Sequence, residues 1–179
     1  MTGKSVCTPV LIYTLTELTI PKLVSYGANN TYKALRVIGD TYNLYYSVWC
    51  TNEHELYDLT TDPHQTTNIY PSSFFSSPDS TPLILGLPIS KVLSRLDALL
   101  MVTKSCRGHT CTHPWSVIHP AGDVATLADA LDERFDAFYL SEGLAKRVGF
   151  EKCELGYIVE SEGPQEAVVF DAERDYLFS

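Results

Sequence analysis

The densest group of reactive side chains lies between residues 106 and 113, where the sequence reads Cys-Arg-Gly-His-Thr-Cys-Thr-His. Two thiols and two imidazoles can complete a tetrahedral zinc site, so Cys106, His109, Cys111 and His113 are candidate zinc ligands. The cysteines do not have the usual C-x2-C spacing, which disfavours zinc. We favour a small loop closed by a disulfide between Cys106 and Cys111, because Gly108 lets the chain turn tightly between them. Two unpaired thiols in a reducing compartment are the remaining alternative.

Other catalytic motifs are missing from the sequence. It contains no Gly-x-Ser-x-Gly elbow and no glycine-rich loop between a strand and a helix, so neither a hydrolase triad nor a phosphate-binding loop is indicated. Glu53, His54 and Glu55 are adjacent, and in a strand adjacent side chains point to opposite faces. This triplet therefore indicates the polar start of a strand rather than an acid/base pair.

Aromatic residues are concentrated between residues 42 and 57. The set consists of Tyr42, Tyr45, Tyr46, Trp49 and Tyr57. Such a set can stack against sugar rings, but it more often packs a sheet face against a neighbouring domain. Both interpretations stay open at the level of sequence.

Three stretches around these residues have the two-residue alternation of β-strands: Tyr32–Ile38, Tyr42–Cys50 and His54–Leu59. Turn-forming residues separate them, Gly39-Asp40 after the first stretch and Thr51-Asn52 after the second. The pattern predicts a three-stranded antiparallel meander. The stretch Gly156–Glu160 is a candidate fourth strand.

Two further stretches have helical periodicity. The first begins at Pro88, ends near residues 106 to 108, and places polar residues such as Arg95 and Asp97 opposite its apolar stripe. The second begins with Asp123 as N-cap and continues to Phe138. A short turn near residues 112–119 separates them, and a long loop follows the strands over residues 60–80. The fold class is therefore predicted to be α+β, a small antiparallel sheet with two main helices and long loops.

Composition excludes two classes of function. The chain has 179 residues, with 13 Lys and Arg against 22 Asp and Glu, for a formal charge of −9. This balance disfavours nucleic-acid partners, whose binding depends on cationic side chains. No apolar run approaches the roughly 20 residues that span a bilayer, so no membrane span is expected.

The N-terminal region has few clear signals. Thr residues and Glu17 interrupt the apolar residues between Val6 and Ile20, so no signal peptide is predicted. Asn29-Asn-Thr is an N-glycosylation sequon that matters only if the chain enters the secretory route. Five cysteines leave at least one unpaired within the chain.

The middle of the chain resembles the C-terminal subdomain of sulfatases. The matching text includes Tyr-Lys-Ala-Leu-Arg-Val-Ile-Gly from Tyr32, Tyr-Tyr-Ser-Val-Trp-Cys from Tyr45, and Glu-Leu-Tyr-Asp-Leu-Thr-Thr-Asp-Pro from Glu55, followed by Asn68-Ile69. Downstream, Cys-Thr-His-Pro-Trp from Cys111 and the stretch from His119 are similar to fungal-type arylsulfatases. The resemblance covers residues 29–164.

The resemblance implies hydrolysis of sulfate esters by a whole protein of this family. In that family a cysteine within Cys-x-Pro-Ser-Arg becomes formylglycine, and Asp and Asn side chains hold a calcium ion beside the sulfate. Neither feature is found in this sequence: Cys7 alone has a proline two residues later, and no arginine follows at the fifth position. Formylglycine and calcium are therefore expected only in a catalytic domain encoded elsewhere.

These observations lead to one preferred expectation and three alternatives. The preferred one is a C-terminal sulfatase domain over residues 29–164, preceded by an unassigned segment 1–28 and followed by an acidic tail 165–179. It would pack against a catalytic domain and border the substrate cleft, would be inactive alone, and would belong to the secretory route. The alternatives are a carbohydrate or sulfated-glycan binding module, a zinc-dependent domain, and a gene fragment that lacks the partner of its apolar sheet face.

Overall fold

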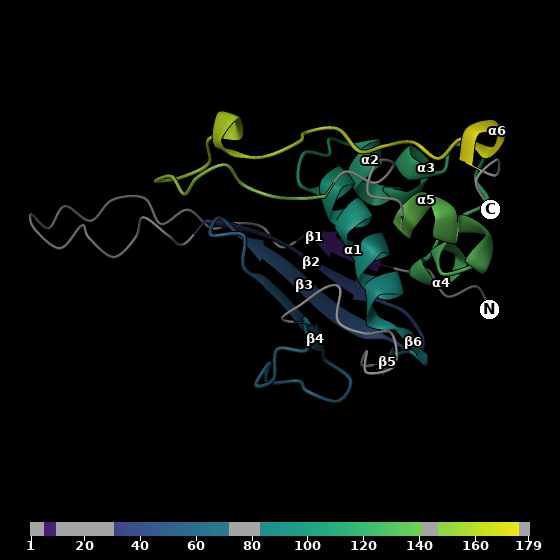
Figure 1. The fold of residues 1–179 in the computed structure, drawn as a ribbon, viewed down its shortest axis with the longest axis horizontal. Coiled ribbons are helices and arrows are strands. Elements are labelled where there is room, and N and C mark those ends of the chain that lie inside the picture. Colours follow the sequence, from purple (N-terminus) through teal and green to yellow (C-terminus); the bar gives the residue numbers. More distant parts are fainter. Residues whose placement is uncertain (1–5, 10–30, 72–82, 141–146, 176–179) are drawn as a thin grey trace, which may run out of the picture.

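The computed structural model describes residues 6–9, 31–71, 83–140 and 147–175, which form an α+β fold (Figure 1). An antiparallel sheet with the order β1-β2-β3-β4 is covered on one face by α1, and the short helices lie beyond it. The strands are β1 (Val6–Pro9), β2 (Tyr32–Ile38), β3 (Asn43–Trp49), β4 (His54–Asp58), β5 (Leu83–Ile84) and β6 (Leu87–Pro88). The helices are α1 (Ile89–Thr103), α2 (His109–Thr112), α3 (Trp115–Ile118), α4 (Leu127–Ala130), η2 (Glu133–Phe135), α5 (Asp136–Leu140), η3 (Val159–Ser161) and α6 (Ala172–Asp175). The predicted fold class is confirmed.

Side-chain alternation divides the sheet into an inner and an outer face. In β3, Leu44, Tyr46 and Val48 are buried on the inner face, and Leu35 of β2 and Leu56 of β4 lie opposite Tyr46 on either side. This face and α1 contribute to one hydrophobic cluster. The predicted meander is confirmed, since its period of two is set by the burial of one face.

The turn between β2 and β3 depends on a glycine. A Cβ atom at Gly39 would lie 2.3 Å from Cζ of Tyr42, because the tyrosine ring folds over this position. The Gly39 N–H donates to the carbonyl of Tyr42 at 2.9 Å and closes the turn. A side chain at position 39 would therefore displace the ring from the core.

The fourth strand comes from the opposite end of the chain to the one predicted. β1 pairs antiparallel with β2, with Val6 opposite Ile38 and Pro9 opposite Leu35. The prediction of a strand at residues 156–160 is wrong: this stretch is a loop that leads into η3. Its backbone turns at Gly156, which has a φ of 94°, and the strand edge of β2 is already occupied by β1.

Helix α1 begins after Pro88, as predicted, but it is buried on nearly all sides. Arg95 and Asp97, expected on its solvent face, are 0% and 6% exposed. The Arg95 guanidinium donates from Nε to the carbonyl of Ala130 at 3.0 Å and pairs with Asp136 at 2.5 Å. For Arg95 the prediction failed because α5 packs against α1. For Asp97 it failed because the Tyr46 hydroxyl of the sheet and the N–H of Val148 both donate to its carboxylate.

The predicted second helix is broken into α4, η2 and α5. Asp123 is not its N-cap: Thr126 caps α4, and its side chain and the Asp129 carboxylate form a capping box. The Asp132 carboxylate then accepts from the N–H of Arg134 at 3.0 Å and starts η2. Side chains that bond to the nearby backbone compete with continuous helix, which explains the break.

The end of the described chain crosses the short helices and is anchored in the core. Phe170 is buried, and its ring contacts His119, Phe135 and Phe138 at centroid distances of 5.0 to 5.4 Å. His119 is fully buried, and its Nε2 lies 2.7 Å from the Tyr139 hydroxyl. Burial lowers the pKa of His119 to about 4, so the ring is neutral at physiological pH.

Candidate functional site

The five aromatic residues singled out by sequence do not share one surface. Tyr42 and Tyr46 are buried on the inner face of the sheet. Tyr45, Trp49 and Tyr57 belong to the outer face, as the strand register places Tyr45 opposite Tyr57. Tyr57 is only 9% exposed, so a recognition surface on this sheet would use mainly Tyr45 and Trp49.

The outer face carries two aromatic pairs. Tyr32 and Trp49 have ring centroids 4.8 Å apart, and Tyr45 and Tyr57 have centroids 6.2 Å apart. Sequence reasoning omitted Tyr32, although the register places it directly opposite Trp49. Rings of this kind present flat apolar surface with polar edges, which suits protein packing or sugar stacking.

Polar groups lie between and beside these pairs. Arg36 is exposed and donates from Nε to Asn43 Oδ1 at 2.8 Å. The Ser47 hydroxyl donates to Glu55 Oε2 at 3.1 Å. The outer face therefore offers both a cation and a carboxylate to a partner.

A buried polar network connects the inner face of the sheet to α1. The Tyr46 hydroxyl donates to Asp97 Oδ1 at 2.9 Å and lies 2.9 Å from Nδ1 of His54, while the N–H of Val148 donates to Asp97 Oδ2 at 3.1 Å. Tyr70 stacks on His54 with centroids 4.7 Å apart. These groups border a cavity of about 90 Å³ together with Arg147.

Burial dominates the electrostatics of this network. It raises the pKa of Asp97 to about 6, against the opposing effect of the two hydrogen bonds that the carboxylate accepts. It also raises the pKa of the Tyr46 phenol and lowers that of the His54 imidazole. The network can hold or release a proton in mildly acidic solution. Ser94 also lines the cavity, but its hydroxyl donates to the carbonyl of Lys91 at 2.9 Å.

The loop from Cys106 to Cys111 is closed by the disulfide that the sequence favoured. Both sulfur atoms are used in this bond, so the four-ligand zinc site is not formed. His109 and His113 stack on each other with centroids 4.2 Å apart, and both are exposed. Within the described residues no group of three or more His, Cys, Asp and Glu side chains is placed to hold a metal ion, and we derive no calcium chemistry from them.

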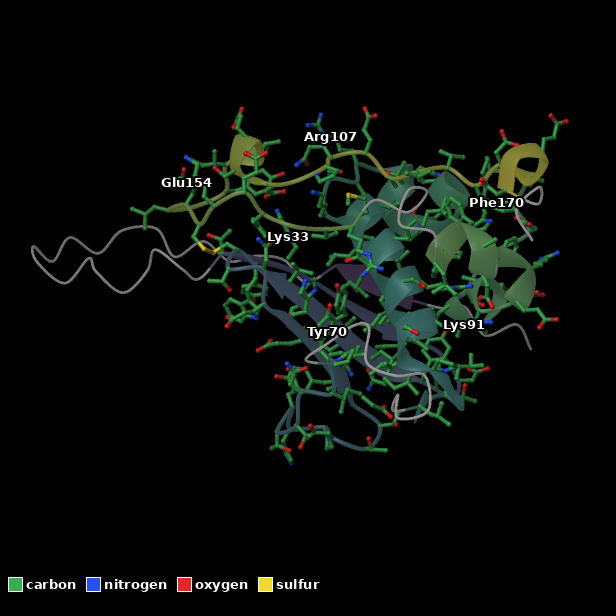
Figure 2. The ribbon with its side chains drawn as sticks, in the orientation of Figure 1. Lys33, Tyr70, Lys91, Arg107, Glu154 and Phe170 are labelled. Carbon is green, nitrogen blue, oxygen red and sulfur yellow. A yellow bond between two sulfur atoms is a disulfide. The ribbon has the colours of Figure 1, made fainter. Side chains whose placement is uncertain are left out.

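A second disulfide joins Cys50, at the end of β3, to Cys153. Local sequence does not predict this pairing, because 103 residues separate the two cysteines. The bond attaches a loop of residues 149–163 to the end of the sheet. We call this segment the apolar loop, since Leu155, Tyr157, Ile158 and Val159 are all exposed at its tip. In Figure 2 the labelled Glu154 lies in this loop, beside the short helix η3 and away from α1.

The Asp-Pro and Asn residues of the sulfatase-like motif have structural roles. Asn68 Oδ1 accepts from the N–H groups of Leu56 and Tyr70 at 3.0 and 2.9 Å, and its Nδ2 donates to the carbonyl of His54 at 3.0 Å. Asn68 therefore satisfies the outer edge of β4 as a neighbouring strand would. The Asp62 carboxylate accepts from the N–H groups of Thr66 and Thr67, and these bonds lower its pKa.

The glycosylation sequon and the expected absence of a membrane span are the last two features predicted from sequence. Asn29, the candidate glycosylation residue, lies outside the described residues. In the described part of the chain no helix has the length and apolar character needed to cross a membrane.

Comparison with known proteins identifies the class. No protein-family profile matches the chain, and no solved structure matches it. It is 43% identical to sulfatase ppz1 of Metarhizium majus over 143 residues, which are 80% of this chain and 30% of that protein. It is 38% identical to an arylsulfatase of Volvox carteri over 113 residues, or 62% of this chain and 15% of the relative. An N-acetylglucosamine-6-sulfatase of Capra hircus is 35% identical over 88 residues, or 48% of this chain and 13% of that enzyme.

The sequence is thus similar to hydrolases of sulfuric esters from a fungus, an alga and a mammal. The chain belongs to the sulfatase family, and the sequence-based resemblance is confirmed. It spans less than a third of the length of the relatives it matches.

Proposed function

We propose that this chain is the C-terminal, non-catalytic portion of an arylsulfatase-like protein, which packs against the catalytic portion and borders its substrate cleft. The observation that carries the proposal is the limited share of each relative that the chain spans, 30% at most. The described residues nevertheless bury a hydrophobic core of their own, while aromatic side chains of the outer sheet face stay partly exposed. A supporting subdomain with an interface face has these properties. In this proposal the domain is residues 29–164, and the flanking segments contribute to it: β1 (Val6–Pro9) adds a strand to its sheet and Phe170 a side chain to its core.

The state of the cysteines supports a non-catalytic role. Cys50, Cys153, Cys106 and Cys111 are in disulfides, and a sulfur atom in a disulfide cannot be the starting point for formylglycine. Cys7 is followed by Thr-Pro-Val-Leu and lacks the Ser-Arg of the modification motif. Two disulfides also support a route through an oxidising compartment, which fits the secretory pathway.

The activity of the purified chain tests this part of the proposal. With nitrocatechol sulfate as substrate and calcium present, we expect no release of nitrocatechol above the rate of a buffer control. Calcium-dependent turnover by the chain alone would contradict the proposal. Intact mass measured in parallel detects an aldehyde at any cysteine, which would contradict it equally.

A second candidate function is the binding of sulfated glycans on the outer sheet face. The observation that favours it is the register, in which the exposed Arg36 lies directly opposite Tyr45 and places a guanidinium beside an aromatic pair. Guanidinium groups form paired hydrogen bonds with oxyanions, and aromatic rings stack on sugars. Titration with heparan sulfate oligosaccharides tests it: the Arg36→Ala variant should lose binding, and equal binding by both proteins would exclude this surface.

A further inference from the structure

We propose that the tip of the apolar loop, Leu155 to Val159, is the element by which this chain docks onto the large remaining portion of a sulfatase polypeptide. This inference rests on the proposed function and extends it by naming the contact surface. It is independent of the aromatic pairs considered for glycan binding.

The composition of the tip marks it as a contact surface. Leu155 is 65% exposed, Tyr157 51%, Ile158 39% and Val159 41%. Four large apolar side chains within five residues form a continuous apolar stretch, whereas exposed apolar residues on monomers are usually scattered. By contrast, the exposed Leu83 belongs to the short hairpin of β5 and β6.

The base of the loop is held firmly, so the tip is presented in a defined position. Gly163 N–H donates to the Gly149 carbonyl at 2.8 Å, and Glu151 N–H donates to the Ser161 carbonyl at 2.9 Å. Asn52, in the turn between β3 and β4, exchanges hydrogen bonds of 2.9 Å with both the N–H and the carbonyl of Phe150. An apolar element that is ordered before binding loses little conformational entropy on binding.

Buried charges fix the orientation of the loop on the sheet. Lys33 Nζ on β2 lies 3.0 Å from Glu162 Oε1, with both side chains at most 5% exposed. The same ammonium group lies 3.9 Å from the centroid of the Tyr157 ring. Lys104, just after α1, lies 3.8 Å from Glu162 on its other side. Figure 2 shows the labelled Lys33 just below the ribbon of the apolar loop.

Two features indicate that the partner of the tip is the remaining portion of a sulfatase polypeptide. The matched stretch is 30% of the Metarhizium majus sulfatase and 15% of the Volvox carteri arylsulfatase, so most of each relative lies outside it. The tip is also joined to the end of the sheet where β2 begins. Thr31 Oγ1 donates to the Glu154 carbonyl at 2.9 Å, and Thr31 and Cys50 directly adjoin the Tyr32 and Trp49 pair. The remainder of the polypeptide can therefore cover the tip together with the end of the sheet to which the loop is joined.

A chimera tests the inference with the full chain. This chain replaces the matched 143-residue stretch of the Metarhizium majus sulfatase, in its unmodified form, as Leu155→Asp, and as Leu83→Asp. Leu155 and Leu83 are each 65% exposed, so the second variant is a matched control for an added charge. The readouts are the amount of secreted chimera, its sulfatase activity and its thermal transition. The thermal transition of the isolated chain is measured for all three sequences.

We expect Leu155→Asp to lower the yield of active chimera about tenfold or more, as for removal of a central interface residue. The isolated chain should melt at the same temperature with either substitution, and Leu83→Asp should leave the chimera unchanged. If the Leu155→Asp chimera matches the unmodified chimera in secreted amount, sulfatase activity and thermal transition, the inference about the apolar loop is overturned while the proposed function stands. If the unmodified chimera is not secreted as a folded protein, the proposed function fails and the inference with it. Sedimentation of the isolated chain as a dimer that Leu155→Asp converts to a monomer would assign the tip to a second copy, and this too would overturn the inference.

Discussion

Removing the disulfide between Cys50 and Cys153 should destabilise the protein far more than removing the one between Cys106 and Cys111. The perturbation is a pair of double variants, Cys50→Ala with Cys153→Ala and Cys106→Ala with Cys111→Ala. Each pair removes two sulfur atoms and one cross-link, so the chemistry is matched. The loops they close differ greatly, with sequence separations of 103 and 5.

The expected magnitudes follow from these separations. A cross-link restricts the unfolded chain, and in the chain-entropy treatment its contribution grows with the logarithm of the loop length. A loop of about 100 residues corresponds to about 4.7 kcal/mol, and a loop of about six residues corresponds to about 2 kcal/mol. The expected difference of about 2.5 kcal/mol is a large part of the 5–15 kcal/mol that separates folded from unfolded states in ordinary domains.

Urea denaturation of the oxidised proteins, followed by circular dichroism, measures the free energy of unfolding. The Cys50 and Cys153 variant should have the lower urea midpoint, and it should also expose the apolar loop to a protease while the sheet remains folded. Equal losses in the two variants, or a greater loss for Cys106 and Cys111, would refute the loop-length argument. Measurements in dithiothreitol are the control. With both disulfides reduced, the unsubstituted protein and the two double variants should have the same free energy of unfolding, apart from the small effect of replacing cysteine by alanine.

Three further predictions concern single side chains. Asp97 has a folded pKa of about 6, above its unfolded value, so its contribution to stability falls by about 3 kcal/mol as the pH rises from about 4 to 6. His119 has the opposite sign. Its folded pKa of about 4 is below its unfolded value, so its contribution to stability rises over about pH 4 to 6.5. Urea midpoints measured against pH should therefore rise with pH in Asp97→Asn and fall with pH in His119→Gln, and parallel curves would contradict this. Asn68→Ala should lower the free energy of unfolding by about 0.5–1.5 kcal/mol, because it removes the hydrogen bonds to edge groups of β4 that are at most partly buried. Faster amide exchange confined to β4 is its specific signature. Asp136→Ala should lower the free energy of unfolding by about 3–5 kcal/mol, because it leaves the buried Arg95 without its carboxylate partner. Arg95→Met should lower it by less. The reverse order in thermal melts would count against a buried ion pair.

Much of the sheet could be predicted from sequence because its burial is one-sided. Alternation in Leu44, Tyr46 and Val48 is the direct result of an inner face that packs on α1. The pairing of β1 with β2 could not be predicted, because Val6–Pro9 is short and its partner lies more than twenty residues along the chain. The polar residues of α1 were misplaced for a related reason: Arg95 and Asp97 are satisfied by partners on other segments, and periodicity records only apolar positions.

The features of the candidate site also divide into those that local sequence predicts and those that depend on tertiary contact. The short disulfide could be inferred from Gly108 and local spacing, but the bond between Cys50 and Cys153 depends on tertiary contact. Three of the four apolar residues of the tip, Tyr157, Ile158 and Val159, fall within Gly156–Glu160, for which the sequence pattern predicts a strand. A strand requires a free edge to pair with, and this requirement is not encoded locally. The proposed docking surface could therefore not be predicted from the sequence pattern.

The two edges of the sheet are protected by different means, and this matters for anyone who shortens the chain. On the far side of β4 the carboxamide of Asn68 and the N–H of Ile69 occupy the outward hydrogen-bonding groups of His54 and Leu56, so this border needs no further strand. On the side of β2 the protection is the four-residue strand β1. A recombinant version that starts after Pro9 would leave β2 as an open template for intermolecular pairing. Such a version should accumulate in inclusion bodies, and a soluble product should retain residues 6–9.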